Sequence, residues 1–99
     1  MVHVFTQDVP IDFGIYQRIV DNIGAEPLEG CLVHLCVRRD DGGLRHIDVW
    51  ESEKLCAKAF AERIHPAVDA ALGGRRPPTG PVSTKLDVLH AWDSAVPVG

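Results

Sequence analysis

The segment that decides the fold is residues 30–52, GCLVHLCVRRDDGGLRHIDVWES. It contains two runs of mainly apolar residues separated by the turn-forming sequence Asp-Asp-Gly-Gly, and this pattern predicts a β-hairpin. Successive side chains of a strand point to opposite sides of the sheet. One side of the predicted hairpin is aliphatic and consists of Val33, Leu35, Val37, Ile47 and Val49. The other side carries the polar and aromatic residues and consists of Leu32, His34, Cys36, Arg38, His46, Asp48 and Trp50.

The length of the turn sets which residues of the two strands lie opposite each other. Directly paired residues point to the same side, so pairing the polar positions with one another requires a loop of odd length. A three-residue loop that ends with Gly42 or Gly43 in the left-handed region meets this requirement. With Gly42 at that position His34 lies opposite Asp48, and with Gly43 it lies opposite Trp50. In both registers these three side chains are close neighbours.

Length and composition limit the class of protein. At 99 residues the chain predicts a single domain, which would gain stability from a partner subunit. The net charge of −4 argues against nucleic acid as a partner, because phosphate binding needs clustered Lys and Arg. No apolar run reaches membrane-spanning length, so we expect no membrane partner and a cytoplasmic location. Three cysteines without Cys-x-x-Cys spacing, Cys31, Cys36 and Cys56, predict buried free thiols.

The remaining residues alternate between strand and helix patterns. Residues 2–6 predict a first strand, and a helix follows that opens near Asp12 and stops at Gly24. Ser52 is a suitable N-cap for a second helix, which ends at Gly73.

The end of the chain adds one strand to this pattern. Pro66 predicts a kink or short break of the second helix near His65. Residues 75–81 form a predicted loop, and residues 84–92 form the last strand. The tail, residues 94–99, is expected to fray or to contact a partner subunit.

The order of elements is βαββαβ, which predicts a ferredoxin-like α+β domain with a four-stranded antiparallel sheet and two helices on one face. We expect the helices to cover the aliphatic side of the hairpin. The opposite, open face is then too apolar for water, which predicts a symmetric homodimer packed through that face. The residues expected on it are Leu32, His34, Cys36, Trp50 and Val88.

Three short motifs carry a family resemblance: Val-Trp-Glu-Ser-Glu at 49–53, Phe60, and His-Pro-Ala at 65–67. They resemble the third-strand and second-helix signature of the dimeric α/β-barrel superfamily, most closely its small actinobacterial members related to antibiotic biosynthesis monooxygenases. The resemblance implies two sheets packed face to face as a homodimer that encloses a small-molecule cavity. It implies either a cofactor-independent monooxygenase, or a related isomerase or cyclase, acting on an aromatic or polyketide-like compound, or else a non-catalytic dimeric binding or structural module.

The haem-degrading branch of this superfamily is a further comparison. Trp50 matches the tryptophan of that branch near the end of the third strand. Ala59 and Phe60, however, occupy the region of its haem-ligating histidine, and His65 comes too late. The first strand also lacks the asparagine of those enzymes, so we expect no haem and no other cofactor.

The candidate catalytic residues come from the polar side of the hairpin and the last strand. His34 is the expected general base, and Asp48 or His90 would orient its imidazole. Trp50 and Trp92 would form walls for an aromatic ligand. Further substrate contacts are expected from Cys36, His46 and Arg38.

Each of these residues also has a structural explanation. His34 and Asp48 can be a polar pair that fixes an interface, the tryptophans can fill a core, and Cys36 can be a packed thiol rather than a nucleophile. A metal site formed by His34, His46, His90 and Asp48 lacks short ligand spacing, so we expect no metal.

Overall fold

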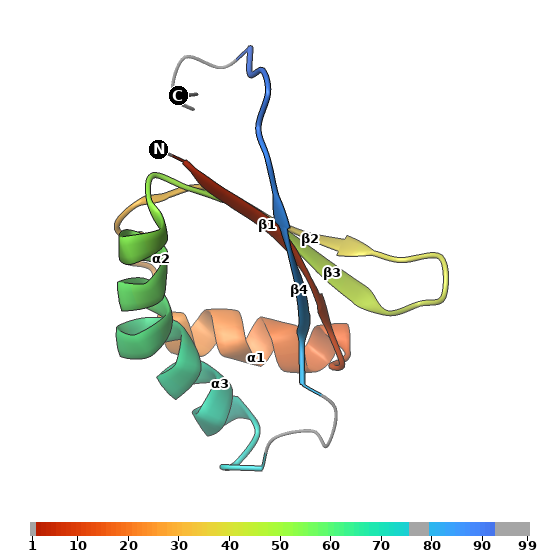
Figure 1. The fold of residues 1–99 in the computed structure, drawn as a ribbon. Helices are drawn as coiled ribbons and strands as arrows, with labels where there is room; N and C mark the ends of the chain where they lie inside the picture. The colour runs from red at the N-terminus through yellow and green to blue at the C-terminus, as the bar shows by residue number, and fades with distance from the viewer. Residues whose placement is uncertain (1, 76–79, 93–99) are drawn as a thin grey trace.

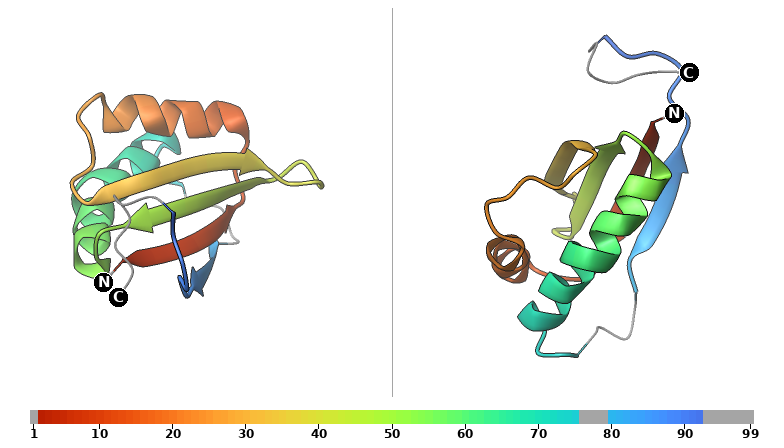
Figure 2. Two further views of the ribbon diagram at one scale, coloured as in Figure 1. Left: turned by 90° about the horizontal axis from the view of Figure 1, so that it is seen from above. Right: turned by 90° about the vertical axis from the view of Figure 1, so that its left-hand side faces the viewer.

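A computed structural model describes residues 2–75 and 80–92, and its elements follow the predicted order βαββαβ. The strands form one antiparallel sheet in the order β2-β3-β1-β4, and the helices lie on one side of it (Figures 1 and 2). Residues 76–79 of the predicted loop and the predicted tail, residues 94–99, lie outside the described residues. The elements are β1 (His3–Val9), α1 (Phe13–Ile23), β2 (Cys31–Arg38), β3 (Leu44–Trp50), α2 (Glu53–Ala59), η1 (Phe60–Ile64), α3 (His65–Ala71) and β4 (Val82–Leu86).

Helix α1 begins and ends where the sequence predicts. The Asp12 carboxylate accepts a hydrogen bond from the backbone N–H of Ile15 at 2.8 Å, which satisfies one of the free donors of the first turn. Gly24 ends the helix, and its N–H donates to the carbonyl of Val20.

The second helical segment is interrupted by a wide turn rather than broken. It begins at Ser52, whose hydroxyl accepts from the N–H of Leu55. In η1 the backbone adopts π-helical geometry, and the N–H of His65 reaches back five residues to the carbonyl of Phe60. The irregularity predicted near His65 is therefore a π turn just ahead of Pro66, whose ring lacks an N–H.

The hairpin has the register in which the loop ends at Gly42. His34 pairs with Asp48 and Cys36 with His46. Gly42 has φ +89°, the left-handed conformation that glycine adopts at no steric cost.

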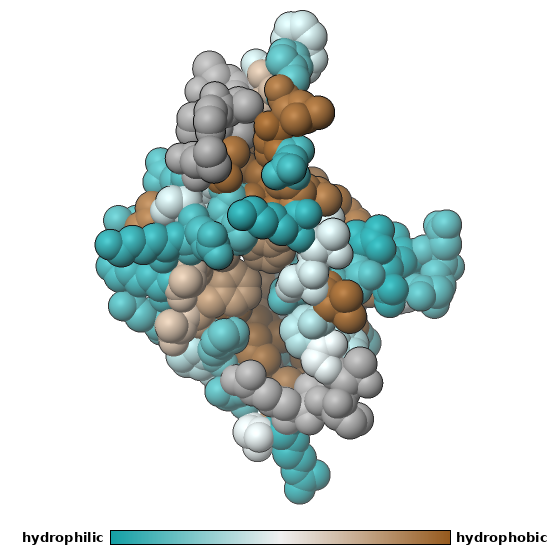
Figure 3. Space-filling model, in the orientation of Figure 1, coloured by the Kyte–Doolittle hydropathy of each residue, from teal (hydrophilic) through white to brown (hydrophobic). Residues whose placement is uncertain are grey.

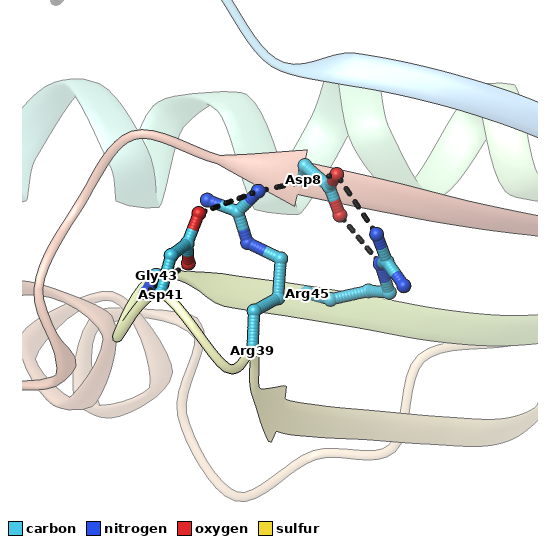
Figure 4. Close-up of polar contacts among 5 residues, drawn as sticks. All are labelled: Asp8, Arg39, Asp41, Gly43 and Arg45. Atoms are coloured by element: carbon cyan, nitrogen blue, oxygen red, sulfur yellow. Dashed lines mark hydrogen bonds and ion pairs between the residues drawn. The ribbon is translucent and has the colours of Figure 1, made fainter.

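Ion pairs join the hairpin to the neighbouring strand (Figure 4). Arg45 of β3 donates two hydrogen bonds to Asp8 of β1, at 2.6 and 3.1 Å. Arg39 at the turn lies 3.5 Å from carboxylate oxygens of both Asp8 and Asp41. The Arg45 guanidinium lowers the pKa of the Asp8 carboxyl.

The side of the sheet that the helices cover differs from the prediction. His34 and Asp48 do share one side, opposite Val33 and Leu35, but that side faces the helices. The expectation that His34, Cys36 and Trp50 lie on an open, dimer-forming face is therefore wrong.

Side-chain size explains this choice. Trp50 is fully buried with Phe5, Cys56 and Ala59 in a core to which the helices contribute. The largest aromatic surface of the sheet thus lies under the helices, where its burial stabilises the fold most. The smaller aliphatic side chains are left on the open face, where Leu35 is 49% exposed.

The last strand is shorter than predicted, because β4 ends at Leu86 rather than at Trp92. Leu86 pairs with Val4, and β1 begins only one residue earlier, at His3. His3 is the one β1 residue left beyond this pair, so residues 88–92 have no β1 partner, and residues 87–92 are not in a strand.

Candidate active site between the helices and the sheet

A cavity of about 490 Å³ lies between the helices and the covered face of the sheet. Brown apolar surface is visible in the hollow between these layers (Figure 3). Its volume is in the range of small-molecule sites. Most of the wall is aliphatic or aromatic, and among the described residues that line it there is no Lys or Arg. The apolar part comes from α1, η1 and α3, with Ile19, Val20, Ile23, Phe60, Ile64, Val68 and Leu72.

One wall of the cavity carries a chain of hydrogen bonds from α1 through β2 to β3. The Tyr16 hydroxyl lies 2.8 Å from Nε2 of His34, and Nδ1 of His34 lies 2.6 Å from Oδ1 of Asp48. Nε1–H of Trp50 donates to Oδ2 of Asp48 at 3.1 Å.

The carboxylate determines how the protons are arranged. Asp48 is only 3% exposed, and each of its oxygens accepts one hydrogen bond, which compensates the loss of water. An ionised carboxylate only accepts, so Nδ1 of His34 carries a proton. In the neutral imidazole Nε2 is then the acceptor, and it accepts a hydrogen bond from the Tyr16 hydroxyl. Asp48 thus binds Nδ1 of His34, and the other ring nitrogen, Nε2, lies toward Tyr16.

His46 is a second imidazole in the same wall. Its ring lies edge-on to His34, with ring centroids 5.1 Å apart, and tilted against Tyr16. Burial lowers the pKa of His46, and a charge on the neighbouring His34 lowers it further. Nε2 of His46 is buried without a hydrogen-bond partner among the described residues. This environment favours the neutral form of His46.

The other predicted contacts from the hairpin divide into two groups. Trp50 and His46 line the cavity, whereas Cys36 and Arg38 are not among its lining residues. Burial raises the pKa of the Cys36 thiol, which favours the protonated form over a nucleophilic thiolate. Cys31 lines the cavity in its place, and like Cys56 it is a free thiol.

The structure does not bring His90 and Trp92 to this wall. Both lie in residues 87–92 beyond β4, where their rings contact each other with centroids 4.8 Å apart. Trp92 is 94% exposed. Within one chain, Asp48 rather than His90 orients His34, and Trp92 forms no wall with Trp50.

The alternative metal set that included His90 is not assembled, and no group of three or more His, Cys, Asp or Glu within residues 2–75 and 80–92 is placed to hold a metal ion.

Tyr16 belongs to this site, whereas its sequence position on the flank of the first helix predicts packing rather than catalysis. The signal was present, because Tyr16, Ile19, Val20 and Ile23 follow the i, i+3, i+4, i+7 spacing of one helix face. All four line the cavity. A tyrosine within an otherwise aliphatic helix face that covers a histidine-bearing strand is a candidate partner for that histidine.

Comparison with known proteins supports the fold. No family model and no curated protein matches the sequence. A candidate antibiotic biosynthesis monooxygenase from Caulobacter crescentus matches with a TM-score of 0.67 at 16% identity, over 90% of this chain and 91% of that one. Rv0793 from Mycobacterium tuberculosis matches with a TM-score of 0.63 at 17% sequence identity, over 93% of this chain and 98% of that one. SnoaB, a cofactor-independent oxygenase from Streptomyces nogalater, matches with a TM-score of 0.58 at 15% sequence identity, over 92% of this chain and 94% of that one.

These similarities confirm the predicted resemblance at the level of fold. The chain has the ferredoxin-like α+β fold of antibiotic biosynthesis monooxygenase proteins. Because the matched structures come from different bacterial groups, the narrower relation to actinobacterial members stays a prediction. No helix in the part of the chain that the structure describes is long and apolar enough to cross a membrane.

Proposed function

We propose that this protein is a small-molecule enzyme of the cofactor-independent monooxygenase type, with His34 as its general base. The observation that carries the proposal is the Asp48–His34–Tyr16 hydrogen-bond chain on the wall of an apolar cavity. An imidazole held by a carboxylate is suited to remove a proton from a phenol or enol. The related fold of SnoaB, a cofactor-independent oxygenase, is consistent with this chemistry.

The cavity favours a neutral aromatic or polyketide-like substrate. Its walls are largely apolar, and a carboxylate or phosphate on the ligand would meet no Lys or Arg among the described lining residues. Trp50 and His46 contribute to this wall and are the proposed substrate contacts that remain within the cavity.

The proposed reaction uses molecular oxygen as the oxidant. His34 accepts a proton from the substrate, and the electron-rich anion reduces O₂. For a substrate carbon with two hydrogens, R₂CH₂ and O₂ give R₂CO and H₂O, so the substrate supplies all the electrons that O₂ accepts. Asp48 stabilises the imidazolium that forms on His34.

We also propose that the chain forms a homodimer through its open sheet face. Leu35, Val82 and Leu86 are exposed apolar side chains on that face of the single chain. The segment after β4 exposes Leu89 and Trp92 almost completely, and residues 88–92 lie beyond the end of β1. A second copy of this chain would bury both features. A cytoplasmic location remains part of the proposal.

A non-catalytic dimeric ligand-binding or structural module is the second candidate. One observation favours it: both ring nitrogens of His34 already have partners, as in a purely structural polar network. In that case the only effect of His34→Ala would be on stability, because Asp48 is left with one donor fewer at a cost of about 1–3 kcal/mol.

The two candidates are separated by oxygen uptake measured with a panel of phenols and quinols, together with thermal melts. If the chain is an enzyme, wild type consumes oxygen with at least one substrate and His34→Ala does not. Absence of turnover by wild type with every substrate of the panel, together with a lower melting temperature of His34→Ala, would contradict the enzymatic proposal. His3→Ala, which removes a histidine that is not among the residues lining the cavity, serves as the control.

A further inference from the structure

We infer that Tyr16 is a catalytic residue of this site: its hydroxyl relays the substrate proton to His34. The inference rests on the proposed function, since it assigns the group through which the proposed base acts. It starts from one distance, the 2.8 Å between the Tyr16 hydroxyl and Nε2 of His34.

The Tyr16 hydroxyl occupies the position that a substrate hydroxyl would need for direct transfer. Nδ1 of His34 is engaged by Asp48, so Nε2 is the nitrogen that can accept a proton. That nitrogen already accepts from Tyr16. A ligand must therefore either displace the phenol or pass its proton through the phenol oxygen.

The contacts of the tyrosine ring argue against displacement. Phe13 of the same helix stacks on the ring with centroids 5.8 Å apart and an interplanar angle of 20°. His46 packs against it from the sheet at 5.2 Å. The rings of Tyr16 and His34 are nearly parallel, with an interplanar angle of 17°. The ring is thus held between a helix neighbour and two strand residues.

A phenol in this position can relay a proton without changing its own charge. Its oxygen donates one hydrogen bond to Nε2 and keeps lone pairs that can accept a second one from the substrate. When the substrate O–H bond breaks, that proton bonds to the Tyr16 oxygen as the proton of Tyr16 moves to Nε2. The products are a substrate oxyanion, a neutral Tyr16 and an imidazolium paired with Asp48.

The electrostatic environment supports a neutral tyrosine. Burial raises the pKa of Tyr16, and the charge of Asp48 raises it further. Tyr16 is therefore a neutral phenol before the reaction, and a concerted transfer of the two protons avoids forming a phenolate.

The relay can be tested with 2-naphthol, whose excited state is a strong acid with different emission from naphthol and naphtholate. The His34 side chain is 35% exposed, so solvent can also accept the proton, and His34→Ala measures that contribution. The probe is excited where tryptophan does not absorb, at protein excess. The naphtholate-to-naphthol emission ratio of the bound probe should be higher in wild type than in His34→Ala, and equal ratios would overturn the proposed function.

Tyr16→Phe is the decisive variant, because it keeps the ring and removes only the hydroxyl. The relay predicts that the naphtholate-to-naphthol emission ratio falls at least about ten-fold while the probe still binds. An unchanged ratio would show that the ligand reaches His34 directly, which overturns the relay but leaves the proposed function intact. Bound probe with naphthol emission alone in wild type, or no binding at all, would instead overturn the proposed function and the relay with it.

A second measurement does not depend on the folding of Tyr16→Phe. Tyr16 is the one tyrosine of the chain, so 3-fluorotyrosine incorporation places a single ¹⁹F label on this ring. If the phenol lies between the probe and His34, 2-naphthol should shift the ¹⁹F resonance in wild type. The shift should be at least halved in a His34→Ala background, where the proton acceptor is missing. A resonance that does not respond to bound 2-naphthol would overturn the relay.

Discussion

The two faces of the sheet are built from alternate residues of the same strands, yet they serve different ends. The covered face combines a fully buried Trp50 with the Asp48–His34 pair, so a hydrogen-bonded polar chain borders an apolar core. The open face is aliphatic around Leu35, and its polar contacts are the exposed ion pairs of Asp8 with Arg45 and Arg39 near the hairpin turn. The difference indicates that the site belongs to the single chain, whereas the open face is available for assembly.

The largest effect is expected at the covered face, from Trp50→Ala. Trp50 is fully buried, and its loss would leave a cavity in the core and remove the donor to Oδ2 of Asp48. The free energy of unfolding should fall by about 3–5 kcal/mol, measured by urea titration followed by far-UV circular dichroism. Trp50→Phe retains most of the packing and should lose less. Equal losses for the two variants would mean that the N–H donor matters more than ring volume.

A charge on the open face should affect assembly rather than the cavity. Leu35→Asp would place a carboxylate in the proposed dimer interface and should weaken dimerisation at least ten-fold, or about 1.4 kcal/mol, in sedimentation equilibrium. Gln17→Asp adds the same charge on an exposed position of α1 and should leave the dimer unchanged. A wild-type protein that stays monomeric at micromolar concentration would contradict the proposed dimer.

A smaller effect concerns the pH dependence of stability at the covered face. The pKa of His46 is lower in the folded chain than its ordinary value of 6.5, so the unfolded chain binds more protons as the pH falls through that value. Stability should therefore decrease on acidification from about pH 7.5 to about pH 5.5. Because His46 is only partly buried, its share should stay below about 1 kcal/mol. His46→Gln should flatten the profile of melting temperature against pH, and an equally steep profile would assign the effect to other groups.

The smallest effect is expected at the ion pairs of the hairpin. Asp8 lies between Arg39 and Arg45 at the surface, where solvent and salt screen such pairs. Asp8→Asn should change the melting temperature little at low salt and not at all at high salt. A large loss that persists in high salt would show that the pair fixes the hairpin more strongly than its exposure suggests.

The register of the hairpin could be predicted, but the side that the helices cover could not. The alternation of side chains requires a hairpin loop of odd length, which restricts the residues that can pair. The sequence allows a loop that ends at Gly42 or at Gly43, and the structure has the loop that ends at Gly42. Both faces contain enough apolar side chains to be buried. The choice depends on how Trp50 packs with residues of a helix far along the chain, and no local pattern contains that contact.

The limits of the site prediction have similar causes. His34 and Asp48 were found because strand pairing brings them together. The assignment of His90 and Trp92 to the same site depends on a strand through residue 92, whereas β1 begins too late to pair with residues 88–92. Tyr16 comes from a helix, and its contact with His34 depends on tertiary packing.

The π turn in η1 has a consequence for the angular phase of the helix that follows it. Four-residue steps along a regular α-helix rotate by about 40° each, so residues spaced in this way drift around the helix axis. Phe60, Ile64 and Val68 are spaced in this way, and they all line the cavity. The π turn of η1 holds about one residue more than an α-helical turn, so it reverses part of this rotation around the helix axis. The π turn thus helps keep Phe60, Ile64 and Val68 on the same side of the helical segment, facing the cavity.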